Sequence, residues 1–207
     1  MKAAFVVIEG LDGAGTTTQC VAIARELRAQ GRQVVTTREP SDGPIGKMIR
    51  QALTGQLGLS AKKKPLTPET LALMFAADRV DHVAREIEPA LANGAVVLSD
   101  RYLLSSLAYQ GAQVPIDWVA EINVRARVPD LTLFLEIDPE MGAQRRAVRG
   151  GKRELYETRA IQRRTARQYL AAIALRRKAG EKIVILDGGA SVAEVTAASM
   201  SALQKRL

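Results

Sequence analysis

Hydrophobic and polar positions follow two alternating patterns along the 207 residues of the chain. Short apolar runs, rich in Val, Ile, Leu and Phe, predict strands at about 3–9, 33–37, 95–100, 131–137 and 183–186. Between these runs, helical patterns predict helices at about 15–30, 44–54, 67–93, 103–110, 116–127, 139–149, 157–179 and 192–204. The alternation of strand and helix predicts a single α/β domain over residues 1–207, with five parallel strands and helices on both faces.

Some details of the helices also follow from the sequence. In the first helix we expect four residues to face the core: Val21, Ile23, Ala24 and Leu27. The long helix at 67–93 should bend or break at Pro89, because proline lacks an N–H group and clashes with the preceding turn. His82, the only histidine, is interpreted as a polar residue on a helix face rather than a catalytic base.

The first predicted strand runs into a glycine-rich segment that nearly matches the phosphate-binding loop G-x-x-x-x-G-K-[ST]. Gly10 and Gly15 have the required spacing, and Thr17 stands where the motif places the hydroxyl that binds Mg²⁺. The backbone N–H groups of such a loop and of the following helix surround the phosphates of a nucleotide. The candidate ATP-binding residues are Gly10, Leu11, Asp12, Gly13, Ala14, Gly15, Thr16, Thr17 and Thr18.

The motif is incomplete, because Thr16 stands where it has a lysine. That lysine neutralises charge on the β- and γ-phosphates of the nucleotide. A glycine-rich turn without a ligand is the alternative, but so many glycines in one turn cost conformational entropy if nothing binds there. The sequence therefore predicts nucleotide binding and leaves the level of catalysis open.

Charged residues follow the predicted strands, and in a parallel sheet ligands bind beyond the carboxyl ends of the strands. These residues are Arg38, Glu39, Asp100, Arg101, Glu136 and Asp138. Asp100 resembles the acid that holds Mg²⁺ in P-loop enzymes, so Thr17 and Asp100 are the candidate metal ligands. Arg38 and Arg101 could hold a second anion in their planar forks. Surface ion pairs are the alternative for each residue, but the convergence favours phosphoryl transfer, with Asp100 and Arg101 as catalytic candidates.

A basic cluster surrounds a predicted hinge at Gly150-Gly151. Its members are Arg145, Arg146, Arg149, Lys152 and Arg153. Cations on a glycine hinge could close over the transferring phosphate as a short lid at about 149–156. The alternative is a solvated basic end of a helix.

Composition narrows the classes of function. The chain is 47% hydrophobic and carries a formal net charge of +8, which indicates either a nucleic-acid surface or sites for small polyanions. No basic groove studded with aromatic residues is apparent, so we expect no nucleic-acid partner. The only cysteine, Cys20, cannot form an intrachain disulfide and fits a reducing cytoplasm. No apolar run is long enough for a signal sequence or a membrane span, so we expect a cytoplasmic protein without a membrane partner.

Several short segments form a common pattern when they are taken in order. They are Glu9-Gly10-Leu11-Asp12-Gly13-Ala14-Gly15, Thr37-Arg38-Glu39-Pro40, Met74-Phe75-Ala76-Ala77-Asp78-Arg79, Asp100-Arg101-Tyr102 with Ser105 and Tyr109-Gln110-Gly111, and Pro129-Asp130-Leu131-Thr132. Together they resemble the thymidylate kinases, a family of P-loop nucleoside monophosphate kinases. The resemblance covers essentially the whole chain, and its Arg-Glu-Pro and Asp-Arg-Tyr elements are specific only in combination.

The resemblance implies a P-loop kinase fold with a short lid and transfer of the γ-phosphate of ATP to dTMP. The product of this reaction is dTDP, and its formation is a step in dTTP biosynthesis. The resemblance also implies Mg²⁺ as the cofactor and a homodimer as the assembly. The implied dTMP-binding residues are Asp12 at the 3′-hydroxyl, Arg38 and Arg101 near the phosphate, Phe75 stacked on thymine, Arg79 on the base, Ser105, Ser106, Tyr109 and Gln110 around base and sugar, and Tyr156 near the nucleoside.

The family places its catalytic arginine either on the P-loop or on the lid. Gly13 occupies the P-loop position, so the resemblance implies the lid arrangement, with Arg149 or Arg153 as the catalytic arginine. Thr16 departs from the family pattern.

Other functions stay open at this point. A deoxynucleoside kinase would share the P-loop, but the cations Arg38 and Arg101 suit an acceptor that already carries a phosphate. A catalytically impaired nucleotide-binding or regulatory homologue is motivated by Thr16. A basic nucleic-acid-binding protein would lose its binding steeply as the salt concentration rises.

Overall fold

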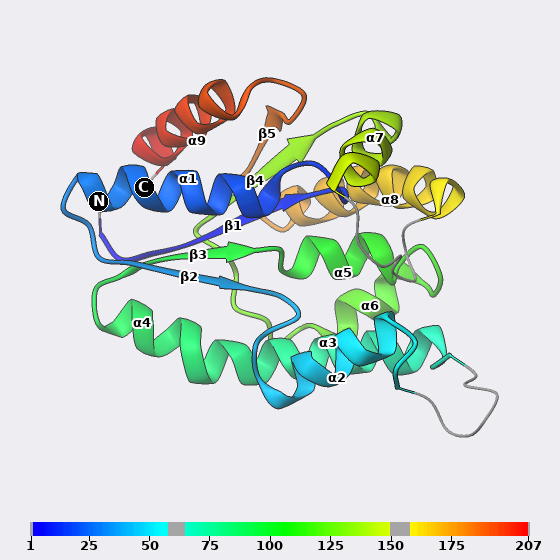
Figure 1. Cartoon of the computed structure of the whole chain (residues 1–207). Helices are drawn as coiled ribbons and strands as arrows, with labels where there is room; N and C mark the ends of the chain where they lie inside the picture. The colour runs from blue at the N-terminus through cyan, green and yellow to red at the C-terminus, as the bar shows by residue number, and fades with distance from the viewer. Residues whose placement is uncertain (1, 58–64, 150–157, 207) are drawn as a thin grey trace.

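The computed structural model describes residues 2–57, 65–149 and 158–206, and its centre is a sheet flanked by helices (Figure 1). The strands are β1 (Ala4–Gly10), β2 (Val34–Arg38), β3 (Val96–Asp100), β4 (Leu131–Glu136) and β5 (Ile183–Asp187). All their pairings are parallel, in the order β2-β3-β1-β4-β5. The predicted five-stranded parallel α/β fold is confirmed.

Helices follow the strands in alternation. They are α1 (Thr16–Ala29), α2 (Pro44–Leu53), α3 (Pro68–His82), α4 (Glu88–Ala92), α5 (Leu103–Tyr109), α6 (Ile116–Ile122), α7 (Pro139–Arg149), α8 (Arg159–Lys178) and α9 (Val192–Arg206), with a π-helical turn η1 (Val83–Ile87) between α3 and α4. In Figure 1, α1 and α9 lie together along one side of the sheet, and α3, η1 and α4 lie along the other. The α6 helix ends at Ile122, earlier than the predicted end at 127.

The long helix predicted at 67–93 consists of α3, η1 and α4. It begins where the sequence indicates, because the Thr67 hydroxyl accepts a hydrogen bond of 3.2 Å from the N–H of Thr70. The irregular turn is η1 rather than Pro89 itself, and in η1 the N–H of Glu88 bonds back to the carbonyl of Val83. Pro89 then falls in the first turn of α4, where its missing N–H costs little. Widening the preceding turn accommodates the proline ring.

The inward face of α1 differs from the prediction at one residue. Ile23, Ala24 and Leu27 are buried, but the Val21 side chain is 65% exposed. Cys20 is buried in its place, which completes the i, i+3, i+4, i+7 spacing of a helix face.

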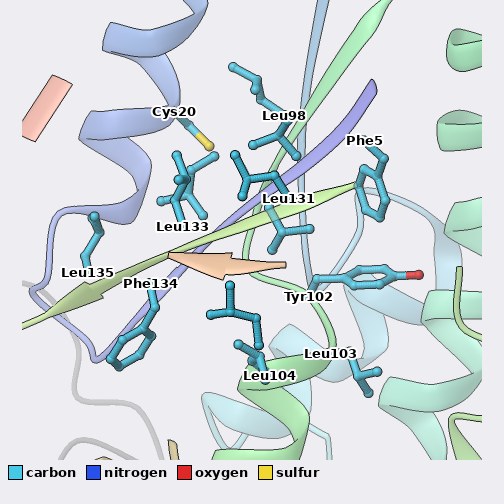
Figure 2. Packing of buried hydrophobic residues seen from close by; sticks show 14 of the residues in the cluster. Phe5, Cys20, Leu98, Tyr102, Leu103, Leu104, Leu131, Leu133, Phe134 and Leu135 are labelled. Atoms are coloured by element: carbon cyan, nitrogen blue, oxygen red, sulfur yellow. The ribbon is translucent and has the colours of Figure 1, made fainter. Parts of the chain in front are cut away.

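Side chains of the sheet pack against helices on both of its faces (Figure 2). Figure 2 shows Leu133 of β4 beside Cys20 of α1, and Phe134 on the opposite side of β4. On that opposite side, the ring of Phe134 lies 4.9 Å from the ring of Tyr169 in α8. β1 is buried along its whole length, so its carboxyl end is fixed rigidly.

The register of the strands brings the predicted site residues to one level. Ile8 of β1 and Arg38 of β2 are both the pairing partners of Asp100 in β3. After β1 the chain moves to β2 and β3 on one side and later crosses to β4 on the other. Ligands of open parallel sheets bind at the carboxyl ends beside such a change of direction.

Candidate active site

The loop between β1 and α1 has the shape of an anion-binding loop. Gly13 and Gly15 adopt left-handed conformations, with φ of 90° and 92°, that L-residues with side chains rarely take up. α1 begins at Thr16, so the unpaired N–H groups of its first turn lie at the end of the loop. A Cβ atom on Gly13 would lie only 2.5 Å from the carbonyl oxygen of Gly142 in α7, so the loop and this helix are in close backbone contact.

A cavity of about 650 Å³ lies over this loop, and we call it the loop cavity. Its walls are residues 12–19, Asp100, Arg101, Arg145, Arg146, residues 188–192 and Val195. Of the predicted ATP-binding residues, Asp12 to Thr18 line the cavity, whereas Gly10 and Leu11 are buried at the end of β1. A volume of this size falls within the usual range for small-molecule sites.

The two predicted metal ligands lie in contact in the wall of the loop cavity. The Thr17 hydroxyl donates a hydrogen bond to Oδ2 of Asp100. The other carboxylate oxygen, Oδ1, is buried and has no hydrogen-bond partner among the described residues. Mg²⁺ is commonly held by one or two protein oxygens together with substrate phosphates and waters. The hydroxyl and the unpartnered carboxylate oxygen therefore fit this ion.

Arg101 lies in the walls of both cavities of the site. Its Nη2 donates to Oδ1 of Asp12 at 2.6 Å, and its Nη1 donates to the carbonyl of Gly10 at 2.8 Å. Its backbone is in the left-handed region, with φ of 71°, which is strained for a residue with a Cβ atom. The guanidinium is therefore aimed at the loop by both its contacts and its backbone.

A second cavity of about 140 Å³ adjoins the first at Asp12 and Arg101, and we call it the acceptor cavity. Its walls are Asp12, Glu39, Pro40, Leu53, Phe75, Arg79, Arg101, Tyr102, Ser105, Ser106, Tyr109 and Gln110. All predicted dTMP-binding residues with described side chains are among them except Arg38. The half-buried Phe75 supplies an aromatic wall.

Arg79 is almost completely buried in the wall of the acceptor cavity, with 1% of its surface exposed. Its Nη2 pairs with Glu39 at 2.7 Å and also donates to Ser106 Oγ at 2.9 Å, and its Nη1 donates to the side chain of Asn123. Nε is buried without a hydrogen-bond partner among the described residues. Most of the guanidinium N–H groups therefore fix the wall of the cavity.

Arg38 does not line either cavity. Its side chain is 58% exposed and pairs with Asp42 at 2.7 Å, and this hydrogen bond lowers the pKa of the Asp42 carboxyl. An exposed pair of this kind is worth at most about 1 kcal/mol, which a dianionic phosphate can outweigh. Its predicted contact with the phosphate of dTMP stays a prediction.

The side chains of three other residues of the predicted site are not described by the structure. Arg153 and Tyr156 lie outside the described residues. Arg149 is the last residue of α7, and the position of its side chain is not described. Their predicted roles stay predictions.

The sequence reasoning missed a buried group beneath the two cavities. Glu9 of β1 accepts a hydrogen bond of 2.6 Å from the Ser105 hydroxyl and one of 3.2 Å from the hydroxyl of Tyr169. Burial raises the pKa of Glu9 even though hydrogen bonds from Ser105 and the charge of Arg101 oppose it. A carboxylate inside an apolar strand is the signal that could have revealed this group, because such a residue needs buried partners.

The interpretation of His82 as a polar residue on a helix face was wrong. His82 is buried, with 3% of its surface exposed, and its ring nitrogens lie 2.7 Å from Thr37 Oγ1 and 3.2 Å from Glu39 Oε1. Burial lowers the pKa of His82, but the hydrogen bond with Glu39 and the charges of Glu39, Glu86 and Asp78 outweigh it and raise the pKa. His82 therefore supports Glu39, which in turn holds Arg79 in the wall.

The chain is similar to known proteins over most of its length. A family model described as thymidylate kinase matches residues 8–198. The chain is 40% identical over 205 residues to a probable thymidylate kinase of Pyrobaculum aerophilum, an alignment that covers 99% of this chain and 97% of the relative. It is 37% identical over 196 residues to a probable thymidylate kinase of Pyrococcus abyssi, with 94% and 93% coverage. Among the described residues, no helix combines the length and apolarity needed to cross a membrane.

Proposed function

The chain belongs to the thymidylate kinase family, and we propose that its two adjoining cavities hold the two nucleotides of that family's reaction. The reaction transfers the γ-phosphate of ATP to dTMP and gives dTDP in dTTP biosynthesis. One observation carries the assignment of the cavities: Asp12 and Arg101 line both, so two bound phosphate chains would meet there.

The loop cavity is the ATP site in this proposal. The N–H groups of the glycine-rich loop and of the first turn of α1 bind the phosphates. Thr17 and Asp100 would hold Mg²⁺, which neutralises charge on the β- and γ-phosphates when it is bound.

The acceptor cavity is the dTMP site. Phe75 offers a ring for the base to stack on, and Ser105, Tyr109 and Gln110 surround the nucleoside. Arg101 lies beside the point where an acceptor phosphate would face the loop. Its planar fork suits phosphate oxygens, and Asp12 holds it in place.

Phosphoryl transfer of this kind needs positioning and charge neutralisation more than acid–base chemistry. The attacking oxygen belongs to the phosphate of dTMP, which is already anionic, so no side chain has to remove a proton. Arg101 touches both cavities and can therefore neutralise charge as the γ-phosphoryl group passes between them.

A panel of acceptors tests the proposal. Initial rates with ATP and Mg²⁺ are compared for dTMP, AMP and thymidine. We expect the highest kcat/KM with dTMP and no turnover of thymidine. Phosphorylation of thymidine would favour a deoxynucleoside kinase, and binding of dTMP without turnover would favour a regulatory protein.

A homodimer in the cytoplasm completes the proposal. Leu73 and Val80 lie seven residues apart on α3 and are 51% and 48% exposed, so this helix offers an apolar strip for a second copy. Cys20 is free and buried, as suits a reducing compartment. Sedimentation of the chain and of Val80→Glu tests the assembly, because a charge in the strip should give monomers.

A further inference from the structure

The loop cavity lacks one positive charge that a P-loop normally carries. Thr16 stands at the position of the lysine, lines the cavity and is only 6% exposed. Its hydroxyl can donate a hydrogen bond but cannot neutralise the charge of the β- and γ-phosphates. A cation from elsewhere in the chain would have to reach the same phosphates.

Three cations of the described residues line this cavity: Arg101, Arg145 and Arg146. Arg101 is paired with the Asp12 carboxylate and faces the acceptor cavity as well. Arg145 donates to the carbonyls of Gly188 and Gly189, at 2.8 and 3.2 Å, on the side of the cavity formed by the segment after β5. Arg146 also contacts the P-loop backbone, because its Nη1 donates to the carbonyl oxygen of Asp12, but unlike Arg101 it does not line the acceptor cavity.

The position of Arg146 is set by a contact between two glycines. A Cβ atom on Gly13 would lie 2.5 Å from the Gly142 carbonyl, and one on Gly142 would lie 2.8 Å from the Asp12 carbonyl. α7 therefore rests directly on the loop at Gly142. Arg146 follows Gly142 by four residues, so it projects from the same face of α7. The half-buried guanidinium is held over the loop rather than displayed to solvent.

The hydrogen bond to Asp12 leaves most of the guanidinium available. Arginine has five N–H donors in a fixed fork, and among the described residues only Nη1 of Arg146 has a hydrogen-bond partner, the Asp12 carbonyl. A guanidinium also stays charged at any physiological pH and binds two phosphate oxygens at once. It can therefore provide, from α7, the positive charge that the missing lysine provides.

We propose that Arg146 supplies the positive charge on the β- and γ-phosphates of ATP that Thr16 cannot supply. The inference rests on the proposed kinase function and deepens it. It assigns the role to a residue of α7 close to the loop, and it requires none of the cations between 149 and 156.

A cycle of substitutions at Arg146 and Thr16 tests the inference. Arg146→Gln removes the charge but keeps a polar, shorter side chain with N–H donors, and we expect it to lower kcat by about two orders of magnitude. Arg146→Lys should retain at least a tenth of the activity. Adding Thr16→Lys to Arg146→Gln should raise kcat at least tenfold over that of Arg146→Gln alone, because the lysine brings a cation to the phosphates from the loop.

Two controls separate this role from a structural one. Arg145 lines the same cavity but contacts another segment. Adding Thr16→Lys to the control variant Arg145→Gln should therefore not restore its kinase activity. Binding of ATP and of AMP to the unreacted protein gives a readout that does not depend on turnover. Arg146→Gln should weaken the binding of ATP at least tenfold and change the Kd of AMP by no more than about twofold, because AMP lacks the β- and γ-phosphates. Equal weakening of both nucleotides would overturn the inference.

The outcomes distinguish this inference from the function on which it rests. If the unmodified chain does not phosphorylate dTMP, the proposed function fails. If the unmodified chain phosphorylates dTMP and the kcat of Arg146→Gln is within about threefold of its kcat, Arg146 does not replace the P-loop lysine. Loss of activity that Thr16→Lys does not restore would also overturn the inference. A fall in kcat, recovery with Thr16→Lys and selective loss of ATP binding together would support it.

Discussion

The guanidinium of Arg101 lies 2.6 Å from the carboxylate of Asp12, and the two residues form the shared wall of the loop cavity and the acceptor cavity. Asp12 comes from the loop after β1, and Arg101 follows β3, the neighbouring strand. The Oδ2 atom of the same carboxylate accepts a hydrogen bond of 2.7 Å from Gln162 in α8. Three elements therefore fix the place where the donor and acceptor phosphates would meet.

Replacing Arg101 should affect the acceptor more than the donor. Arg101→Ala removes the cation that lines both cavities and that we propose binds the acceptor phosphate, so we expect kcat/KM for dTMP to fall by about two to three orders of magnitude. Arg101→Lys should recover only part of this loss, because an ammonium group lacks the planar fork. Arg25→Ala, an exposed arginine of α1, is the control and should leave the rates unchanged. An unchanged KM for dTMP in Arg101→Ala would contradict the assignment.

Removing the aromatic wall of the acceptor cavity should weaken the binding of dTMP and leave the binding of ATP unchanged. Stacking of a base on an aromatic ring is worth about 1–3 kcal/mol, so Phe75→Ala should weaken dTMP binding by about tenfold or more. Phe75→Tyr keeps the ring and serves as the matched variant. Calorimetric titration with dTMP and with ATP measures both sites. Weaker ATP binding with unchanged dTMP binding would mean that the two cavities have been assigned the wrong way round.

The metal dependence should follow the pair of Thr17 and Asp100. Asp100→Asn removes the charge that would attract Mg²⁺, so we expect the Mg²⁺ concentration for half-maximal rate to rise at least about tenfold. Thr17→Ala should raise it as well, whereas Thr17→Ser keeps the hydroxyl and should stay close to the unmodified chain. Rates measured over a series of Mg²⁺ concentrations at fixed ATP give the comparison. The same Mg²⁺ dependence in Asp100→Asn would count against this ion site.

His82 should make stability depend on pH near neutrality. The hydrogen bond and charge of Glu39, with Glu86 and Asp78, overcome the opposite effect of burial and raise the pKa of His82 in the folded chain. A base with a raised pKa stabilises the fold fully below its unfolded pKa, and this contribution is lost as the pH rises through the folded pKa. The free energy of unfolding should therefore fall from about pH 6.5 upward.

His82→Asn tests this dependence, because His82 is the only histidine of the chain. Denaturant unfolding at a series of pH values should show a flatter profile between about pH 6 and 8 for the variant than for the unmodified chain. Parallel profiles would show that His82 does not cause the dependence.

Much of the fold could be predicted from sequence because its signals are local. The strands are short apolar runs, and charged residues mark their carboxyl ends, such as Asp100 at the end of β3 and Arg101 after it. The contact of Thr17 with Asp100 agrees with the rule that ligand-binding residues of a parallel sheet gather at the carboxyl ends of its strands. These features depend on neighbours in sequence or on simple topology.

The features that were missed depend on distant partners. Glu9 looked like a motif residue, and only the fold shows that Ser105 and Tyr169 bury and bind it. Arg146 was one of several basic residues near a hinge until the approach of Gly142 to Gly13 placed it on the loop. Sequence spacing carries no information on these long-range contacts.

Transfer of label from γ-labelled ATP is the measurement that tests the central claim most directly. The unmodified chain is incubated with γ-labelled ATP, Mg²⁺ and dTMP, and the labelled products are separated. We predict that the label appears in the terminal phosphate of dTDP, at a rate that depends on dTMP and falls to background without Mg²⁺. Label found only in inorganic phosphate, or retained entirely in ATP while dTMP binds, would contradict the account.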